Sequence, residues 1–302
     1  MLPENFLVRQ FKCTHCCVKM LCILLSHPRT QVLYKKNSEA CKPTAMDKFH
    51  VQSVLVTGSN QGIGLGLVSQ FLMKPNPPEW VFATSLDPEG PNGKKLKKLA
   101  LRHPNLVVLQ LDIRDLKSIE AAVQRVEEHV KENGLTLLIN NAAILVKFTH
   151  LANETAKNMS DLYNTNTVGT LQVSQAFLPL LKVAAQRRLQ EGLSCSKASI
   201  VNIASDFGSL EKMAGWGLSQ VISYRCSKAA VNMLTRCQSL EYGPLGILCI
   251  SIHPGWVKTS MGTCLVPTTV SESCSGILKV LSAVTDKDSG SFIDWKGRVV
   301  PW

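Results

Sequence analysis

The sequence contains no run of about 18 uncharged apolar residues, the length that a helix needs to cross a bilayer. The longest such stretch in the N-terminal part, Met20 to Leu25, is much shorter. We therefore expect no membrane-spanning segment and no membrane among the partners of the protein.

Acidic residues are scarce: the sequence has 22 of them against 33 lysines and arginines, so its net charge is +11. Much of the excess lies in a leader, residues 1–45, in which seven basic residues meet only two acidic ones. A second basic cluster, residues 94–98, falls on an expected helix and is typical of a solvated face. We therefore expect no nucleic acid among the partners.

The cysteines give no sign of a disulfide framework, because their number, 11, is odd. Cys226, Cys237 and Cys249 fall in apolar helix or strand contexts, which favours buried thiols in a reducing compartment such as the cytoplasm. A Cys-x-x-Cys pair in the leader has no second pair at zinc-finger spacing, so we expect no metal site.

The leader itself shows no clear period and is expected to be disordered or an isoform extension that precedes a usual start at Met46. Its basic, acid-poor composition also has some likeness to a mitochondrial presequence, which leaves a mitochondrial location as the alternative to a cytoplasmic one.

From Val51 onward the sequence alternates between short apolar runs and segments with helical spacing. A strand at 54–56 runs into a glycine-rich turn, 57–64, and a helix over 65–72; Asp115 caps the helix over 116–131. Such alternation predicts an α/β protein with one doubly wound parallel sheet of the Rossmann type, in a single domain over 46–302. The predicted strands are 54–56, 80–84, 106–111, 136–139, 199–203 and 247–252, and the remaining predicted helices are 94–102, 153–189 and 221–240.

Polar and glycine residues follow several of these strands directly. In the turn, Gly58 permits a tight bend, Gly62 lets backbone amides approach a pyrophosphate, and Gly64 allows the helix to pack closely on the strand. Ligands of such sheets bind beyond the carboxyl ends of the strands. The sequence therefore predicts one site where these ends converge, marked by Gly58, Asp112, Asn140, Ser205 and Pro254.

Tyr224 and Lys228 are four positions apart and share one face of the predicted helix. A neighbouring ammonium favours the phenolate, so we expect Lys228 to lower the pKa of Tyr224 and make its hydroxyl a usable proton donor.

Together these motifs resemble the short-chain dehydrogenase/reductase family over roughly residues 51–302, in its single-domain branch. The family's Thr-Gly-x-x-x-Gly-x-Gly, Asn-Asn-Ala-Gly and Tyr-x-x-x-Lys motifs correspond to Thr57–Gly64, Asn140–Ala143 and Tyr224–Lys228, with Ala143 replacing a glycine. The phrase Gln175–Leu181 and the ending Val299–Trp302 are similar to sniffer-type and C-factor-like carbonyl reductases.

The resemblance implies an NAD(P)-dependent carbonyl reductase, commonly a homodimer or homotetramer, acting on a small carbonyl compound. Tyr224 would be the general acid, Lys228 would bind the nicotinamide ribose, Ser205 would orient the carbonyl, and Asn166 would hold a water of a proton relay. Cofactor contacts are implied for Gly58, Ser59, Asn60, Gln61, Gly62, Ile63, Gly64, Ser85, Asp112, Ile113, Asn140, Ala142, Tyr224, Lys228, Pro254, Gly255, Val257 and Thr259.

Two alternatives stay open at this point. NADP is the preferred cofactor, although Asp87, two positions beyond Ser85, would favour NAD if it met the ribose. The alternative function is a catalytically idle dinucleotide-binding or signalling protein on the same fold. The long gap between Ser205 and Tyr224 further predicts that a loop including 213–219 lines the substrate site.

Overall fold

The computed structural model describes residues 8–11, 20–23, 49–146, 149–188, 191–217, 220–262, 266 and 268–302. The chain divides into two compact units, Met1–Thr44 and Ala45–Trp302. In the smaller unit β1 (Val8–Phe11) and β2 (Met20–Ile23) pair in antiparallel fashion, two strands that the sequence analysis did not predict. The other predictions for the leader lie outside the described residues.

The larger unit is built on a seven-stranded sheet in the order β5-β4-β3-β6-β7-β8-β9, with every neighbouring pair parallel. The predicted doubly wound sheet is confirmed, and each predicted strand is present with its ends shifted by no more than one residue. The strands are β3 (Ser53–Val56), β4 (Trp80–Ser85), β5 (Leu106–Gln110), β6 (Leu137–Asn140), β7 (Ser199–Ile203), β8 (Leu248–His253) and β9 (Phe292–Asp294).

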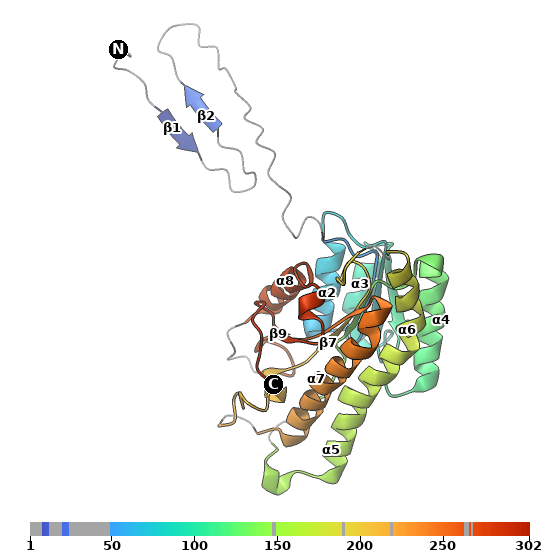
Figure 1. The fold of residues 1–302 in the computed structure, drawn as a ribbon, viewed down its shortest axis with the longest axis vertical. Helices are drawn as coiled ribbons and strands as arrows, with labels where there is room; N and C mark the ends of the chain where they lie inside the picture. Colours follow the sequence, from blue (N-terminus) through green and yellow to red (C-terminus); the bar gives the residue numbers. More distant parts are fainter. Residues whose placement is uncertain are drawn as a thin grey trace. The chain divides into compact units, whose positions relative to one another are not determined.

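Helices cover both faces of this sheet, with α4 and α6 on one side and α2 and α8 on the other (Figure 1). The long helix predicted over 153–189 is instead three pieces, α5, a π-helical turn at Asn164–Gly169, and α6. The helices are α2 (Gly62–Leu72), α3 (Lys94–Ala100), α4 (Leu116–Val130), α5 (Ala156–Tyr163), α6 (Thr170–Gln186), α7 (Ile222–Tyr242) and α8 (Val270–Leu281).

Two apolar cores fill the space between the helices and the sheet, because alternate side chains of a strand point to opposite faces. In β6, Leu137 and Ile139 belong to the core beneath α2 and α8, whereas Leu138 belongs to the core beneath α4 and α6. All three side chains are fully buried. Burial on both faces explains why the strands read as continuous apolar runs in the sequence.

One helical stretch, Ala156–Gln186, is long and apolar enough by composition to cross a membrane, and half of its most apolar window is buried inside the protein. Its α6 part packs against α4, β6 and β7.

The larger unit contains two elements that the sequence analysis missed. Helix α8 packs against α2, and β9 extends the sheet beyond β8. α8 begins with a capping box, in which the Thr269 hydroxyl accepts from the Glu272 N–H while Glu272 accepts from the Thr269 N–H.

The thiol prediction needs one correction. Cys249 in β8 is buried as expected, but Cys226 and Cys237 are exposed on α7. The buried face of α7 is formed by other positions, among them Lys228, Val231 and Thr235.

We expect Leu138→Ala to lower the free energy of unfolding by about 2–5 kcal/mol, because it removes a fully buried side chain from the central strand and leaves a cavity. The matched variant Met233→Ala, at a site that is 64% exposed, should change it by no more than about 0.5 kcal/mol. Urea unfolding followed by circular dichroism measures both; equal effects would contradict the assignment of the core.

Candidate active site

The glycine-rich turn between β3 and α2 lies at the carboxyl end of the sheet. Gly58 has a φ of 64°, in the left-handed region, and a Cβ there would lie 2.9 Å from the Ala142 Cα. At Gly64 a Cβ would collide with the Gly58 carbonyl oxygen. The close approach of helix and turn therefore requires glycine at both positions, as predicted.

The N-terminus of α2 is open to an anion. Gln61 occupies the N-cap position but makes no capping hydrogen bond, and the first turn contains no acidic residue. The first N–H groups of the helix, from Gly62 to Gly64, thus keep their hydrogen-bonding capacity and the positive end of the helix dipole. This geometry fits a phosphate group of a dinucleotide.

Thr57 and Asn141 hold this turn against the segment that follows β6. The Thr57 hydroxyl accepts from the N–H groups of Asn141 (2.9 Å) and Ala142 (3.0 Å). The Asn141 amide donates in return to the carbonyls of Thr57 (2.8 Å) and Gly58 (3.0 Å). The two predicted motifs therefore form one unit.

The segment after β8 reaches the same turn, since a Cβ on Gly62 would lie 3.3 Å from Thr259 Cγ2. Gly255 adopts a φ of 86°, and the Pro254 carbonyl accepts from the Ser273 hydroxyl at 2.6 Å. Val257 is buried and pairs with Thr268. The structure thus brings the predicted residues after β8 to the predicted phosphate site.

Several predicted cofactor contacts have side chains that are already engaged within the fold. The Ser59 hydroxyl donates to the Val56 carbonyl at 2.5 Å, and the buried Asn140 amide donates to Ser174 (3.0 Å) and Asn202 (2.9 Å). The Ser59 hydroxyl hydrogen and the Asn140 amide hydrogens are thus used within the protein, whereas Asn140 Oδ1 is buried without a hydrogen-bond partner.

The ends of β4 and β5 carry the remaining predicted contacts. Ser85 is buried and accepts from the Asp87 N–H at 3.3 Å. Asp112 pairs with Arg114 at 3.0 Å, and this hydrogen bond lowers the pKa of the Asp112 carboxyl. Ile113 is buried against Gly169 of the π-helical turn.

Asn166 lies in that π-helical turn and is almost fully buried. Its Oδ1 accepts from the Ile144 N–H (2.8 Å), and its Nδ2 donates to the Ile144 carbonyl (3.0 Å) and to Ser227 Oγ (3.0 Å). Both amide hydrogens are therefore used within the protein. These hydrogen bonds tie the segment after β6 to α7, and the predicted role of Asn166 in holding a water stays a prediction.

Ser205, Tyr224 and Lys228 meet where β7 ends and α7 begins. Ser205 lies near enough to Tyr224 for its side chain to lower the pKa of the Tyr224 hydroxyl. Lys228 Nζ lies 5.7 Å from the centroid of the Tyr224 ring and donates to the Ile203 carbonyl at 2.7 Å. The three residues predicted to form the catalytic centre are brought together.

The electrostatic prediction for this pair is wrong in the structure. Burial raises the pKa of Tyr224 to about 12, and it also lowers the pKa of Lys228 to about 8. Removal from water disfavours the charged form of each group, and the Lys228 ammonium is bonded to Ile203. The Ser205 hydrogen bond lowers the Tyr224 pKa, but by less than burial raises it.

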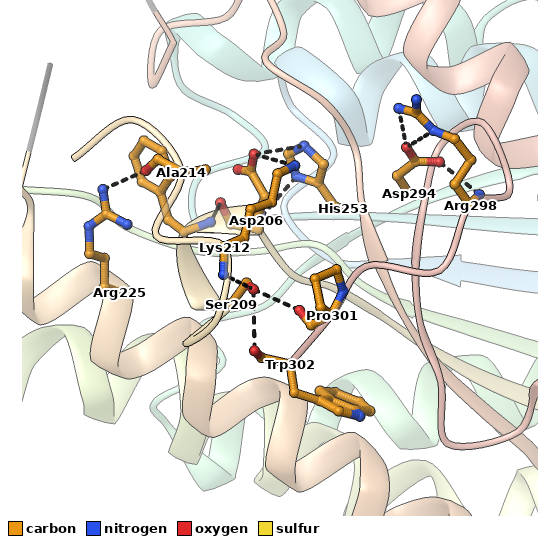
Figure 2. A network of polar contacts seen from close by, with 12 residues as sticks. Asp206, Ser209, Lys212, Ala214, Arg225, His253, Asp294, Arg298, Pro301 and Trp302 are labelled. Carbon is orange, nitrogen blue, oxygen red and sulfur yellow. Dashed lines mark hydrogen bonds and ion pairs between the residues drawn. The ribbon is translucent and has the colours of Figure 1, made fainter. Parts of the chain in front are cut away.

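A buried carboxylate lies one residue beyond Ser205. Asp206 Oδ2 is 3.5 Å from Lys212 Nζ and 3.7 Å from His253 Nε2, and the Asp206 N–H donates to His253 Nδ1 at 3.1 Å (Figure 2). Burial lowers the pKa of His253, which favours the neutral ring with its hydrogen on Nε2. The charge of Asp206 in turn raises the pKa of Tyr224.

Aromatic rings adjoin Tyr224. The Phe207 ring stands edge to face with Tyr224, at a centroid distance of 6.4 Å, and with Trp256 at 5.8 Å. A Cβ on Gly215 would lie 2.8 Å from Trp256 and 3.0 Å from Phe207. The loop predicted to line the site, 213–219, therefore reaches these rings through Gly215, while residues 218–219 lie outside the described part.

The sequence analysis missed five residues described above: Asn141, Asp206, Phe207, His253 and Trp256. All but Phe207 stand directly beside a residue that was predicted, and this adjacency was the available signal. Among the described residues, no group of three His, Cys, Asp or Glu side chains could hold a metal ion.

The parallel sheet, the glycine turn at a helix N-terminus and the Ser-Tyr-Lys cluster define a dinucleotide-binding class of protein. Residues 52–269 match the family model described as short chain dehydrogenase. The chain therefore belongs to the short-chain dehydrogenase family.

Solved structures agree with this assignment. The NADPH-bound carbonyl reductase from chicken fatty liver is 54% identical, with a TM-score of 0.82 over 84% of this chain and 95% of that one. The carbonyl reductase Sniffer of D. melanogaster is 35% identical, with a TM-score of 0.80 over 84% and 100%. The C-signal protein of Myxococcus xanthus is 33% identical over 55% of this chain and 92% of its own length.

We expect Asp206→Asn to lower the pKa of Tyr224, because it removes the nearby negative charge, and Ser205→Ala to raise it, because it removes a hydrogen bond that favours the phenolate. Ultraviolet difference titration against Tyr224→Phe isolates the Tyr224 signal. Shifts in the same direction in both variants would contradict these electrostatics.

Proposed function

We propose that the protein reduces a carbonyl group, of an aldehyde, ketone or quinone, to an alcohol with NADPH. The observation that carries this proposal is that Ser205, Tyr224 and Lys228 lie together, at the edge that also holds the glycine turn. Support comes from the carbonyl reductases that the chain resembles at 54% and 35% identity.

Bound NADPH would supply a hydride to the carbonyl carbon. The hydroxyls of Ser205 and Tyr224 lie near each other, and in the proposed reaction both donate to the carbonyl oxygen as negative charge develops there. With a pKa of about 12, Tyr224 stays protonated at neutral pH and is the proton donor. Ser205 holds the oxygen beside it.

Lys228 is the charged group of this centre. Its pKa of about 8 lies near the working pH, so the buried ammonium can both bind a ribose hydroxyl and change its protonation during turnover. Asn166 acts through Ser227, whose hydroxyl donates to the Tyr224 carbonyl at 2.8 Å. Asn166 is thus a positioning residue for the helix that carries the acid.

NADPH is the proposed cofactor because the one acidic side chain near the ribose position is occupied. Asp87 Oδ1 accepts from the Gly90 N–H at 2.8 Å, which directs its carboxylate into its own turn. A free carboxylate at this position would bond a ribose hydroxyl and repel a phosphate.

We expect Tyr224→Phe to reduce turnover by at least about a hundredfold, the contribution of a positioned general acid, while NADPH affinity changes by less than about threefold. NADPH oxidation in the presence of aldehydes, ketones and quinones, together with a fluorescence titration of binding, measures both. Tyr163→Phe, an exposed tyrosine on α5, is the matched control.

Unchanged turnover in Tyr224→Phe would refute the assignment of the acid. Tight NADPH binding by the unaltered protein with no oxidation across the panel would instead support the alternative, a protein that binds the dinucleotide without chemistry.

We expect kcat/KM to be at least about tenfold higher with NADPH than with NADH, and Asp87→Asn to leave this ratio within about threefold, because the amide can still accept from Gly90. Initial rates with both cofactors test this expectation. A ratio that moves strongly toward NADPH in the variant would show that Asp87 meets the ribose instead.

A further inference from the structure

Arg225 directly follows Tyr224, yet its side chain performs a different task. Consecutive helical residues leave the axis about 100° apart, so Arg225 points away from the Ser205 hydroxyl that Tyr224 meets. Its Nε donates to the Gln220 carbonyl (2.7 Å) and its Nη2 donates to the Ala214 carbonyl (2.7 Å), as Figure 2 shows for Ala214. The guanidinium thus joins α7 to the segment that precedes it.

The same guanidinium lies against two aromatic rings. The Arg225 Cζ is 4.3 Å from the centroid of Phe207 and 5.4 Å from that of Trp216. Phe207 is also the ring that contacts Tyr224 and Trp256 edge to face. We call Phe207, Trp216 and Trp256 the aromatic wall.

The aromatic wall is placed beside the reacting groups. Trp256 follows Pro254 and Gly255, the segment assigned to the cofactor, and Phe207 lies two residues beyond Ser205. Trp216 is 43% exposed, and Phe207 and Trp256 are half-buried. The rings therefore keep apolar surface available, and the Phe207 ring does so beside the Tyr224 ring.

We propose that Arg225 is a positioning residue that fixes the aromatic wall beside Tyr224, and that this wall selects carbonyl substrates with an aromatic substituent. The selection of aromatic substrates rests on the proposed function. The positioning of the aromatic wall by Arg225 does not. A charged side chain that is 93% buried needs partners, and Arg225 finds them in two carbonyls, two ring faces and the nearby charge of Asp206.

A role in stability alone would explain why Arg225 is buried. It would not explain why the partners of Arg225 lie in the segment that contacts the aromatic wall. Arg225 binds the chain at Ala214, immediately before Gly215, and Gly215 packs against both Phe207 and Trp256. Loss of the two Arg225 hydrogen bonds would release this segment and the rings together, whereas Tyr224 would stay beside Ser205. Substrate binding should therefore suffer more than proton donation.

The test compares two diketones that differ by one exchange of methyl for phenyl, diacetyl and acetylbenzoyl. In Arg225→Met we expect KM for acetylbenzoyl to rise at least about tenfold, as for a lost apolar contact, and KM for diacetyl to rise less than about threefold. Arg225→Lys keeps the charge but loses the planar guanidinium that donates to two carbonyls. Its KM for acetylbenzoyl should lie between that of Arg225→Met and that of the unaltered protein. The exposed Arg236→Met, on the same helix, should change neither value.

Hydrogen exchange of the peptide 207–217 gives a second readout that does not need turnover. We expect its protected amides to exchange at least about tenfold faster in Arg225→Met, while peptides from the core of α7 stay unchanged. Equal changes in KM for both diketones, or unchanged exchange in 207–217, would overturn the inference. If the unaltered protein reduces neither diketone, the substrate part fails with the proposed function, and the exchange result still decides whether Arg225 positions the wall.

Discussion

The site depends on one buried side chain, that of Asn166. It bonds both the N–H and the carbonyl of Ile144 and, on its other side, Ser227 of α7. Ile144 continues the segment whose Asn141 and Ala142 hold the glycine turn. A single amide therefore connects the proposed phosphate site with the helix that carries Tyr224. The π-helical turn places it there, and each of its buried hydrogen bonds contributes about 1 kcal/mol, more if a partner is left unpaired.

Removal from water then decides the protonation state of Tyr224 and Lys228. In the structure Tyr224 holds its proton more tightly than a free tyrosine, and Lys228 holds its proton less tightly than a free lysine. This state suits a centre that must deliver a proton only when a carbonyl oxygen becomes strongly basic. The Lys228 ammonium has three N–H donors, so a bound cofactor hydroxyl would accept from it while the bond to the Ile203 carbonyl remains.

Sequence reasoning located the site because parallel strands place their carboxyl ends along one edge. Gly58, Ser205 and Pro254 could be assigned to that edge from strand patterns alone. The spacing of Tyr224 and Lys228 also gave the correct helix face, but it could not give the pKa shifts, which depend on burial by distant segments. The π-helical turn left no pattern in composition, and β9, with only three residues, was too short for its alternation to be read.

Tyr224 and Arg225, adjacent residues of α7, illustrate why sequence motifs predict the proposed reaction better than they predict which substrate is chosen. Tyr224 meets Ser205 across a local junction that strand ends and helix spacing determine. Arg225 reaches carbonyls and rings contributed by Gln220 and by the irregular segment 207–217, whose path no periodicity encodes. Phe207 touches both residues, so the position of the proposed proton donor and the shape of the surface beside it are linked through one ring. Under the proposed function, a change in the irregular segment would alter which carbonyl compound is accepted while Ser205 and Tyr224 remain in place.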